Sequence, residues 1–84
     1  MQKIIHTLQV RDYVVYEHDS TTLLAVSYEV DTLKEMAIKI ASDELFDEEW
    51  KEITNGWMLE VVMGSDGTNI YESETYYVTT QVVV

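Results

Sequence analysis

Hydrophobic and polar residues alternate along the first third of the chain and predict two strands there. In residues 3–18, apolar residues such as Ile4, Leu8 and Val10 recur at every second position, and Arg11 interrupts the pattern. A polar turn at residues 18–20 follows, and residues 21–30 alternate again. Because the connection is short, we expect the two strands to form an antiparallel hairpin.

The period then changes from two to between three and four, which predicts a helix. Thr32 and Glu35 have the spacing of a capping box, so the helix is expected to begin at Asp31 and Thr32. The apolar residues that follow at helical spacing form one stripe, and it consists of Leu33, Met36, Ala37, Ile40 and Ala41.

Residues 43–53 do not continue that stripe. On one straight helix, Phe46, Trp50 and Ile53 would lie nearly opposite Leu33. A break near residues 42–47 resolves this conflict, and Asp47 is a suitable N-cap for a short second helix. In this interpretation, Asn55 and Gly56 are the stop signal of the second helix.

The last third of the chain predicts a second hairpin. Residues 57–63 alternate, residues 64–67 are rich in turn-forming types, and residues 68–84 form a last strand, with a possible interruption near residues 72–74. The whole chain, residues 1–84, is expected to be a single α+β domain. Its sheet would be four-stranded and mainly antiparallel, in the order strand, strand, helix, short helix, strand, strand, with the helices on one face.

The composition is that of a folded chain without covalent cross-links. Among 84 residues, 46% are hydrophobic, and two Trp, six Tyr and one Phe supply aromatic surface for a packed core. There is no Cys, so disulfides and thiol chemistry are excluded. No apolar run reaches the ~18 residues that a membrane span needs, and no signal peptide is recognisable. We therefore expect a cytoplasmic protein.

Residues that carry catalysis or bind metals are scarce. The two histidines, His6 and His18, lie in or beside strands and belong to no motif. No nucleophile elbow, Gly-rich phosphate loop or metal-binding sequence is present. The sequence therefore predicts no catalytic residue, no cofactor and no dedicated metal site, and the protein is not expected to be an enzyme.

Charge is the most unusual property of the chain. Sixteen acids against five bases give a net charge of −11. Residues 1–42 carry six acids and four bases, a net −2, whereas residues 43–84 carry ten acids and one base, Lys51, a net −9. A net charge of magnitude ~2–8 is enough to keep a small domain soluble. The excess therefore favours a function over a solubility requirement.

The acids are densest in residues 43–52, where six of ten side chains are carboxylates. On a helix those ten residues span ~15 Å, or one charge per ~2.5 Å, compared with one per ~1.7 Å along duplex DNA. Glu60, Asp66, Glu72 and Glu74 of the last hairpin are expected to extend the acidic surface, since Glu72 and Glu74 share one strand face. The predicted partner-binding residues are Asp43, Glu44, Asp47, Glu48, Glu49, Glu52, Glu72 and Glu74.

In size and charge the chain is similar to the small acidic inhibitors that phages and mobile elements encode, which include DNA mimics and anti-CRISPR proteins. This resemblance is one of composition. It implies a non-catalytic inhibitor in a host cell, whose partner is the basic nucleic-acid-binding groove of a protein such as a nuclease, with no direct contact to nucleic acid or membrane. Tyr71, Tyr76 and Tyr77 are candidate contact residues. The alternative is an accessory interaction module or an edge-strand homodimer, in which the acids serve solubility.

Overall fold

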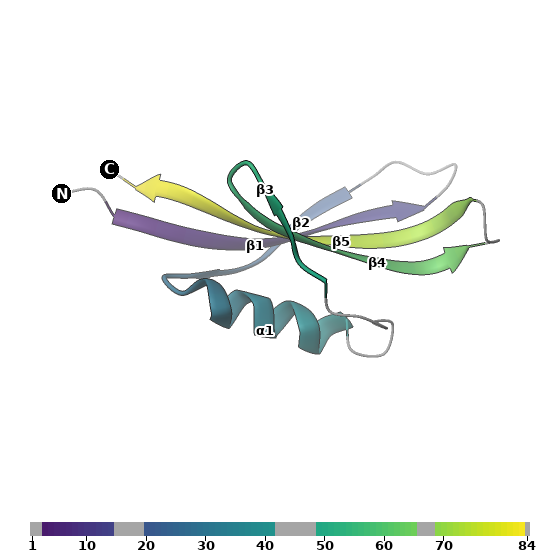
Figure 1. Ribbon diagram of the computed structural model, residues 1–84, viewed down its shortest axis with the longest axis horizontal. Helices are drawn as coiled ribbons and strands as arrows, with labels where there is room; N and C mark the ends of the chain where they lie inside the picture. Colours follow the sequence, from purple (N-terminus) through teal and green to yellow (C-terminus); the bar gives the residue numbers. More distant parts are fainter. Residues whose placement is uncertain (1–2, 15–19, 42–48, 66–68, 84) are drawn as a thin grey trace.

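The computed structural model describes residues 3–14, 20–41, 49–65 and 69–83 (Figure 1). Strands account for most of them, and one helix connects the second strand to the third. The elements are β1 (Lys3–Val14), β2 (Ser20–Ser27), α1 (Val30–Ala41), β3 (Lys51–Ile53), β4 (Gly56–Ser65) and β5 (Ile70–Val83).

The strands form one antiparallel sheet in the order β2-β1-β5-β4-β3. The long strands β1 and β5 lie in the centre and pair along their whole length, from Lys3 with Val83 to Val14 with Glu72. The prediction of a four-stranded sheet with two helices is therefore wrong. The described residues form five strands and a single helix, and the protein is mostly sheet.

The error lies in residues 51–56. Lys51–Ile53 is a short strand that pairs with β4, where a second helix was expected. Asn55 lies in the turn between β3 and β4 and Gly56 is the first residue of β4, so they do not end a helix. The Asn55 carbonyl accepts a hydrogen bond from the Thr80 amide at 2.8 Å, which fixes this turn to β5. Tertiary pairing decides the structure here, because a three-residue strand is too short to show a period.

One face of the sheet is covered by α1, and the core lies between them (Figure 1). Leu33, Ala37 and Ala41 are the buried residues of the helix, at a spacing of four. They pack against side chains of the three central strands, and the buried hydrophobic residues of the sheet are Leu8, Val10, Leu59, Val61, Tyr76 and Val78. The predicted stripe is thus confirmed for its buried centre, whereas Met36 and Ile40 remain exposed.

The start of the helix differs from the predicted capping box. The helix begins at Val30, two residues before Thr32. Ser27 Oγ accepts a hydrogen bond from the Glu29 amide at 3.1 Å, and Thr32 Oγ1 donates to Glu29 Oε2 at 3.3 Å. Side-chain oxygens therefore organise the turn that joins β2 to α1, but Thr32 is not the N-cap.

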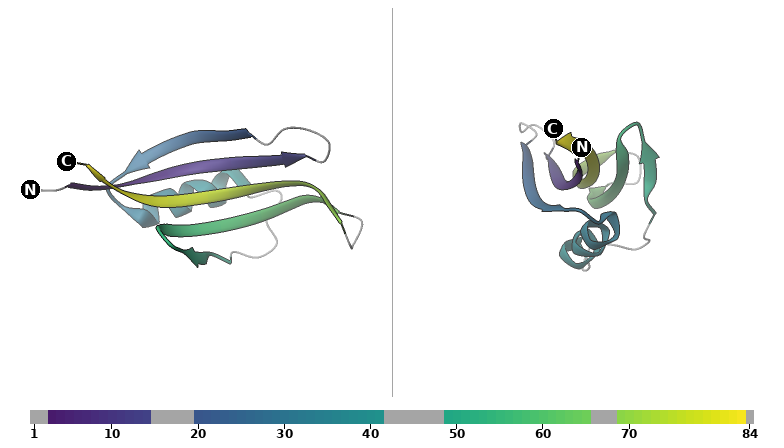
Figure 2. Two further views of the ribbon diagram at one scale, coloured as in Figure 1. Left: turned by 90° about the horizontal axis from the view of Figure 1, so that it is seen from above. Right: turned by 90° about the vertical axis from the view of Figure 1, so that its left-hand side faces the viewer.

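The sheet is strongly twisted, and its strands extend past both ends of the helix (Figures 1 and 2). Seen along the long axis, β2 and the β3–β4 hairpin turn down on either side of α1, so the sheet curls around it (Figure 2, right). The molecule measures 50 × 25 × 20 Å. Long strands with right-handed twist produce this shape.

Gly56 is the position where the β3–β4 hairpin comes closest to β5. Its φ is +155°, and a Cβ at this position would collide with the carbonyl oxygen of Val78. We expect Gly56→Ala to lower the free energy of unfolding by about 2 kcal/mol or more, because backbone strain and a clash with β5 add together. Urea denaturation measures the change.

Gly64→Ala is the matched control for Gly56→Ala. A Cβ on Gly64 would meet its nearest neighbours, in Tyr71 and Glu72, at an ordinary contact distance of 3.7 Å. The control should change stability by less than about 1 kcal/mol. Equal losses in the two variants would contradict the close approach of Gly56 to β5.

Candidate interaction surface

Charged side chains are divided unequally between the two faces of the sheet. Residues paired directly across antiparallel strands point to the same face, so the register shows which side chains share a face with the core residues Leu8 and Tyr76. By this register, the helix-facing side of the described strands carries no Lys or Arg and four carboxylates, which are Asp12, Glu52, Glu72 and Glu74. We call it the acidic side.

The opposite side, which α1 does not cover, has the reverse balance. We call it the open face. Its charged residues on the described strands are Lys3, Arg11 and Lys51, against one carboxylate, Glu60. Strand alternation therefore separates charge across the thickness of the sheet, and the strongly negative net charge is not spread evenly over the molecule.

Three of the four carboxylates on the acidic side lie together on β1 and β5. Asp12 is directly opposite Glu74, and Glu72 lies two residues from Glu74 on the same strand face. Directly opposed like charges destabilise a sheet. Asp12 and Glu74 are half-buried, and Glu72 is exposed. We call these three residues the acidic trio.

Tyr76 is the neighbour that stabilises the acidic trio. Its side chain is 1% exposed, and its hydroxyl donates a hydrogen bond to Glu74 Oε2 at 2.8 Å. Burial of the phenol, together with this hydrogen bond and the negative charges of Glu74 and Asp12, raises the pKa of Tyr76 well above its usual range. The phenol therefore keeps its proton and acts as a permanent donor to Glu74. Because it is buried, Tyr76 is not the contact residue that the sequence suggested.

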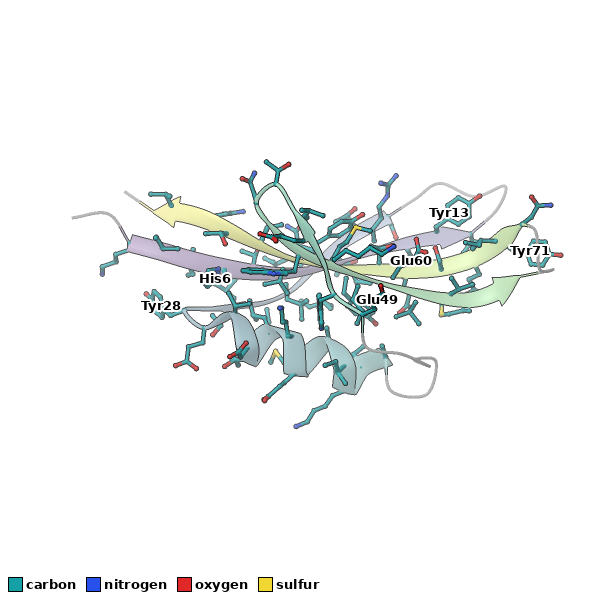
Figure 3. The ribbon with its side chains drawn as sticks, viewed as in Figure 1. His6, Tyr13, Tyr28, Glu49, Glu60 and Tyr71 are labelled. Carbon is teal, nitrogen blue, oxygen red and sulfur yellow. The ribbon has the colours of Figure 1, made fainter. Side chains whose placement is uncertain are left out.

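The predicted partner-binding residues are only partly described. Asp43, Glu44, Asp47 and Glu48 lie outside the described residues. Glu49 is exposed in the segment that leads from α1 to β3 (Figure 3), and Glu52 is exposed on β3, opposite Trp57. Glu72 and Glu74 share one strand face, as predicted, and that face also carries Glu52. Glu60 does not extend this surface as expected, because it lies on the opposite face of the sheet, and Asp66 is outside the described residues.

Lys34 of α1 is held by two tryptophans. Its Nζ lies 4.6 Å from the centroid of the Trp57 ring and 5.4 Å from that of the Trp50 ring. Cation–π attraction of this kind contributes roughly 0.5–2 kcal/mol. Both rings pack against the core, so the contact joins α1 to β4 and to the start of β3. This contact could not be predicted from the sequence, because no local spacing links Lys34 to Trp57.

A shallow hollow lies on the open face, above β1, β5 and β4. Its volume is about 360 Å³, and it is lined by Arg11, Tyr13, Glu60, Thr75 and Tyr77. Arg11, Thr75 and Glu60 form one row across the three strands, and Tyr13 and Glu60 both lie on this upper side (Figure 3). The tyrosines Tyr13 and Tyr71, which are 38% and 42% exposed, are the aromatic rings available for contact near this end of the sheet.

Groups that bind metals do not converge in the described part of the chain. Within residues 3–14, 20–41, 49–65 and 69–83, no three side chains of His, Cys, Asp or Glu are placed to hold a metal ion. His6 is half-buried, and its Nδ1 forms a hydrogen bond of 3.1 Å with Thr80 Oγ1; His18 is outside the described residues. No helix in this part of the chain is long and apolar enough to cross a membrane.

Comparisons with known proteins give no relative for this chain. No protein-family model matches the sequence, no curated protein matches it, and no solved structure matches the fold.

Asp12→Asn is expected to stabilise the protein. The variant removes the repulsion between Asp12 and Glu74 and should raise the free energy of unfolding by roughly 0.2–1 kcal/mol at low salt. In ~1 M NaCl the gain should shrink, because the Debye length falls to ~3 Å. Urea denaturation at both salt concentrations measures the effect. Asp31→Asn is the control with the opposite sign, since Asp31 lies in the first turn of α1, where a carboxylate is favourable by roughly 0.3–1 kcal/mol. A loss of stability in Asp12→Asn would refute the repulsion.

Tyr76→Phe should change how stability depends on alkaline pH. Because the folded state raises the pKa of Tyr76, the unfolded chain releases this proton first, and the contribution of the phenol to stability is complete below pH ~10 and falls above it. At neutral pH the variant should lose about 1–3 kcal/mol with the hydrogen bond to Glu74. Denaturation from pH ~8 to ~11.5 should show the gap between wild type and variant narrowing as pH rises. A gap that widens would contradict the assignment.

Proposed function

We propose that this protein is a non-catalytic inhibitor whose acidic side binds a basic groove of a nucleic-acid-binding protein. Occupation of the groove would exclude the nucleic acid, as a DNA mimic or an anti-CRISPR protein does. The observation that carries the proposal is the concentration of carboxylates on the helix-facing side of the described strands, to which the strands themselves contribute no Lys or Arg.

The arrangement of charge supports a binding role better than a role in solubility. Solubility requires charge on the surface but no preference for one face of a sheet. Here the acidic trio brings Asp12 and Glu74 into direct opposition, at a cost in stability. A basic partner would convert this repulsion into attraction. Long-range attraction would also raise the association rate, in a way that depends on ionic strength.

Within the acidic side, the residues differ in what they can contribute. Glu52 and Glu72 are exposed, so their carboxylates can approach a cationic partner without rearrangement. Glu74 is half-buried, and its Oε2 accepts the Tyr76 hydroxyl, so it supports the field of the trio more than direct contact. Glu72 is therefore the residue whose charge reversal tests the proposal best.

A pair of charge reversals on the two faces of the sheet tests the proposal. Glu72→Lys and Glu60→Lys change the net charge equally, both residues are exposed, and they lie on adjacent strands, but Glu60 is on the open face. The immobilised protein is incubated with a cell lysate at about 50 mM NaCl and eluted with excess duplex DNA. Proteins released by DNA are purified. For each of them, we measure how well this protein competes with labelled duplex DNA for binding. Glu72→Lys should weaken that binding by at least about tenfold, and Glu60→Lys should have little effect.

Two outcomes would refute the proposed function. One is binding that persists undiminished in about 500 mM NaCl, since electrostatic attraction between exposed groups is screened there. The other is an equal loss in Glu72→Lys and Glu60→Lys, which would show that total charge and not the acidic side determines binding. Circular dichroism of both variants verifies that each is folded.

A further inference from the structure

The sheet has two edges, and they differ in how well they are protected against pairing with another strand. An edge strand leaves a row of backbone donors and acceptors unpaired, and proteins commonly protect it with charged residues or by keeping it short. β3 has both features, because it is three residues long and contains Lys51 and Glu52. Beyond Met58, β4 itself forms this edge among the described residues, and it carries Glu60. β2 has neither, since it is eight residues long and none of its residues, Ser20–Ser27, is charged.

The unprotected edge also exposes apolar side chains. Leu23 is 56% exposed and Val26 is 51% exposed, and both lie on the open face, opposite Gln9 and Thr7 of β1. Leu24, at the irregularity in the pairing with β1, is exposed as well. In a chain with 16 acids, an edge that is both charge-free and apolar stands out from the rest of the surface.

The neighbouring flank of α1 is uncovered too. Lys34 is turned toward Trp57 of β4, and Met36 lies about 200° further around the helix. Met36 and Ile40 therefore lie on the flank turned away from β4, which is the β2 side of the sheet, and they are 43% and 58% exposed. Viewed along the long axis, β2 forms one wall of the curled sheet, and no described element lies beyond it (Figure 2, right).

The bulge in β2 makes its pattern of faces symmetric. Thr22 and Ala25 share the helix-facing side, and Thr21 and Val26 share the open face, because the extra residue Leu24 shifts the alternation. Antiparallel partners must lie on the same face. Two copies of β2 satisfy this condition when Thr22 pairs with Ala25 and Thr21 with Val26 of the second copy, about a two-fold axis near Leu23 and Leu24.

We propose that the protein forms a symmetric homodimer in which β2 pairs antiparallel with β2 of a second copy. The self-complementary pattern of faces in β2 fits a second copy of the same strand, and the absence of charge selects this edge. Two copies that each carry −11 repel one another. Because β2 contains no carboxylate, pairing between two β2 strands places no carboxylate of one strand opposite a carboxylate of the other. The dimer joins two five-stranded sheets into one, and the exposed flanks of the two helices, with Met36 and Ile40, face each other across the axis.

This inference does not depend on the proposed inhibitor function, but it has a consequence for it. A two-fold axis perpendicular to the sheet leaves both acidic sides facing the same way. A partner with two basic grooves, or one long one, would then meet two acidic sides at once, and the second contact would form at a high effective concentration.

The dimer is tested by molar mass in solution. Sedimentation equilibrium or light scattering is measured from about 10 μM to about 1 mM protein, at low and high NaCl. The molar mass of the wild type should reach twice 9.8 kDa. It should do so at a lower protein concentration in high salt than in low salt, because salt screens the repulsion between copies. A wild type that remains monomeric over the whole range in high salt would overturn the proposal, and would leave the edge to a different partner.

Val26→Glu and Val62→Glu form the matched pair of variants. Both valines are exposed on the open face, but Val62 lies on β4, on the other side of the sheet from β2. Val26→Glu should halve the molar mass, and Val62→Glu should leave the dimer intact. Dimerisation of Val26→Glu as strong as that of the wild type would contradict pairing through β2.

Should Val26→Glu fail to fold, amide hydrogen exchange of the wild type decides. Protection of β2 amides that rises with protein concentration supports the pairing, and protection independent of concentration opposes it.

Discussion

The contact between α1 and one face of the sheet is the interaction on which the other features depend. Ala37 and Ala41 are small, so the helix backbone comes close to the sheet, and Leu33 fills the space beside them. Against these residues pack Leu8 and Val78 of the central strands, which are fully buried. Burial of a Leu or Val side chain contributes roughly 1.5–3 kcal/mol. Coverage of one face makes the two sides of the sheet different, and the placement of charge follows from that difference.

Because successive strand residues point to opposite faces, a carboxylate two residues from a core residue shares the face of the helix. Asp12 follows Val10 in this way, and Glu74 precedes Tyr76. These acids lie at the end of the face, next to buried apolar residues, and not on the solvent-exposed open face. The Tyr76 hydroxyl, itself buried, is the polar group that the fold supplies to the carboxylate of Glu74. The acidic trio is thus a consequence of the same alternation that builds the core.

Patterns that involve one element alone were predictable from the sequence. The buried centre of the helix stripe, the strand that contains residues 57–63 and the shared face of Glu72 and Glu74 were predicted correctly, whereas Met36 and Ile40 of the stripe are exposed. Features that depend on distant residues were not. The strand Lys51–Ile53 has no period of its own, and a Gly after Asn suits both a helix end and a hairpin turn. Only the approach of Gly56 to Val78 decides between them.

The proposed interactions of the acidic side and of the β2 edge respond to the negative charge of the chain in opposite ways. A chain with net charge −11 gains affinity for a cationic partner as salt is lowered, and affinity for its own copy as salt is raised. The two interactions also use different parts of the fold, since the acidic trio lies on β1 and β5, whereas β2 carries no charge. Under the two proposals both interactions can operate in one molecule, with the β2 edge joining copies and the carboxylates facing a basic partner. The absence of charge on β2 then matters as much as the carboxylates do. A single acid on that edge would add repulsion between the two β2 strands and weaken the proposed dimer.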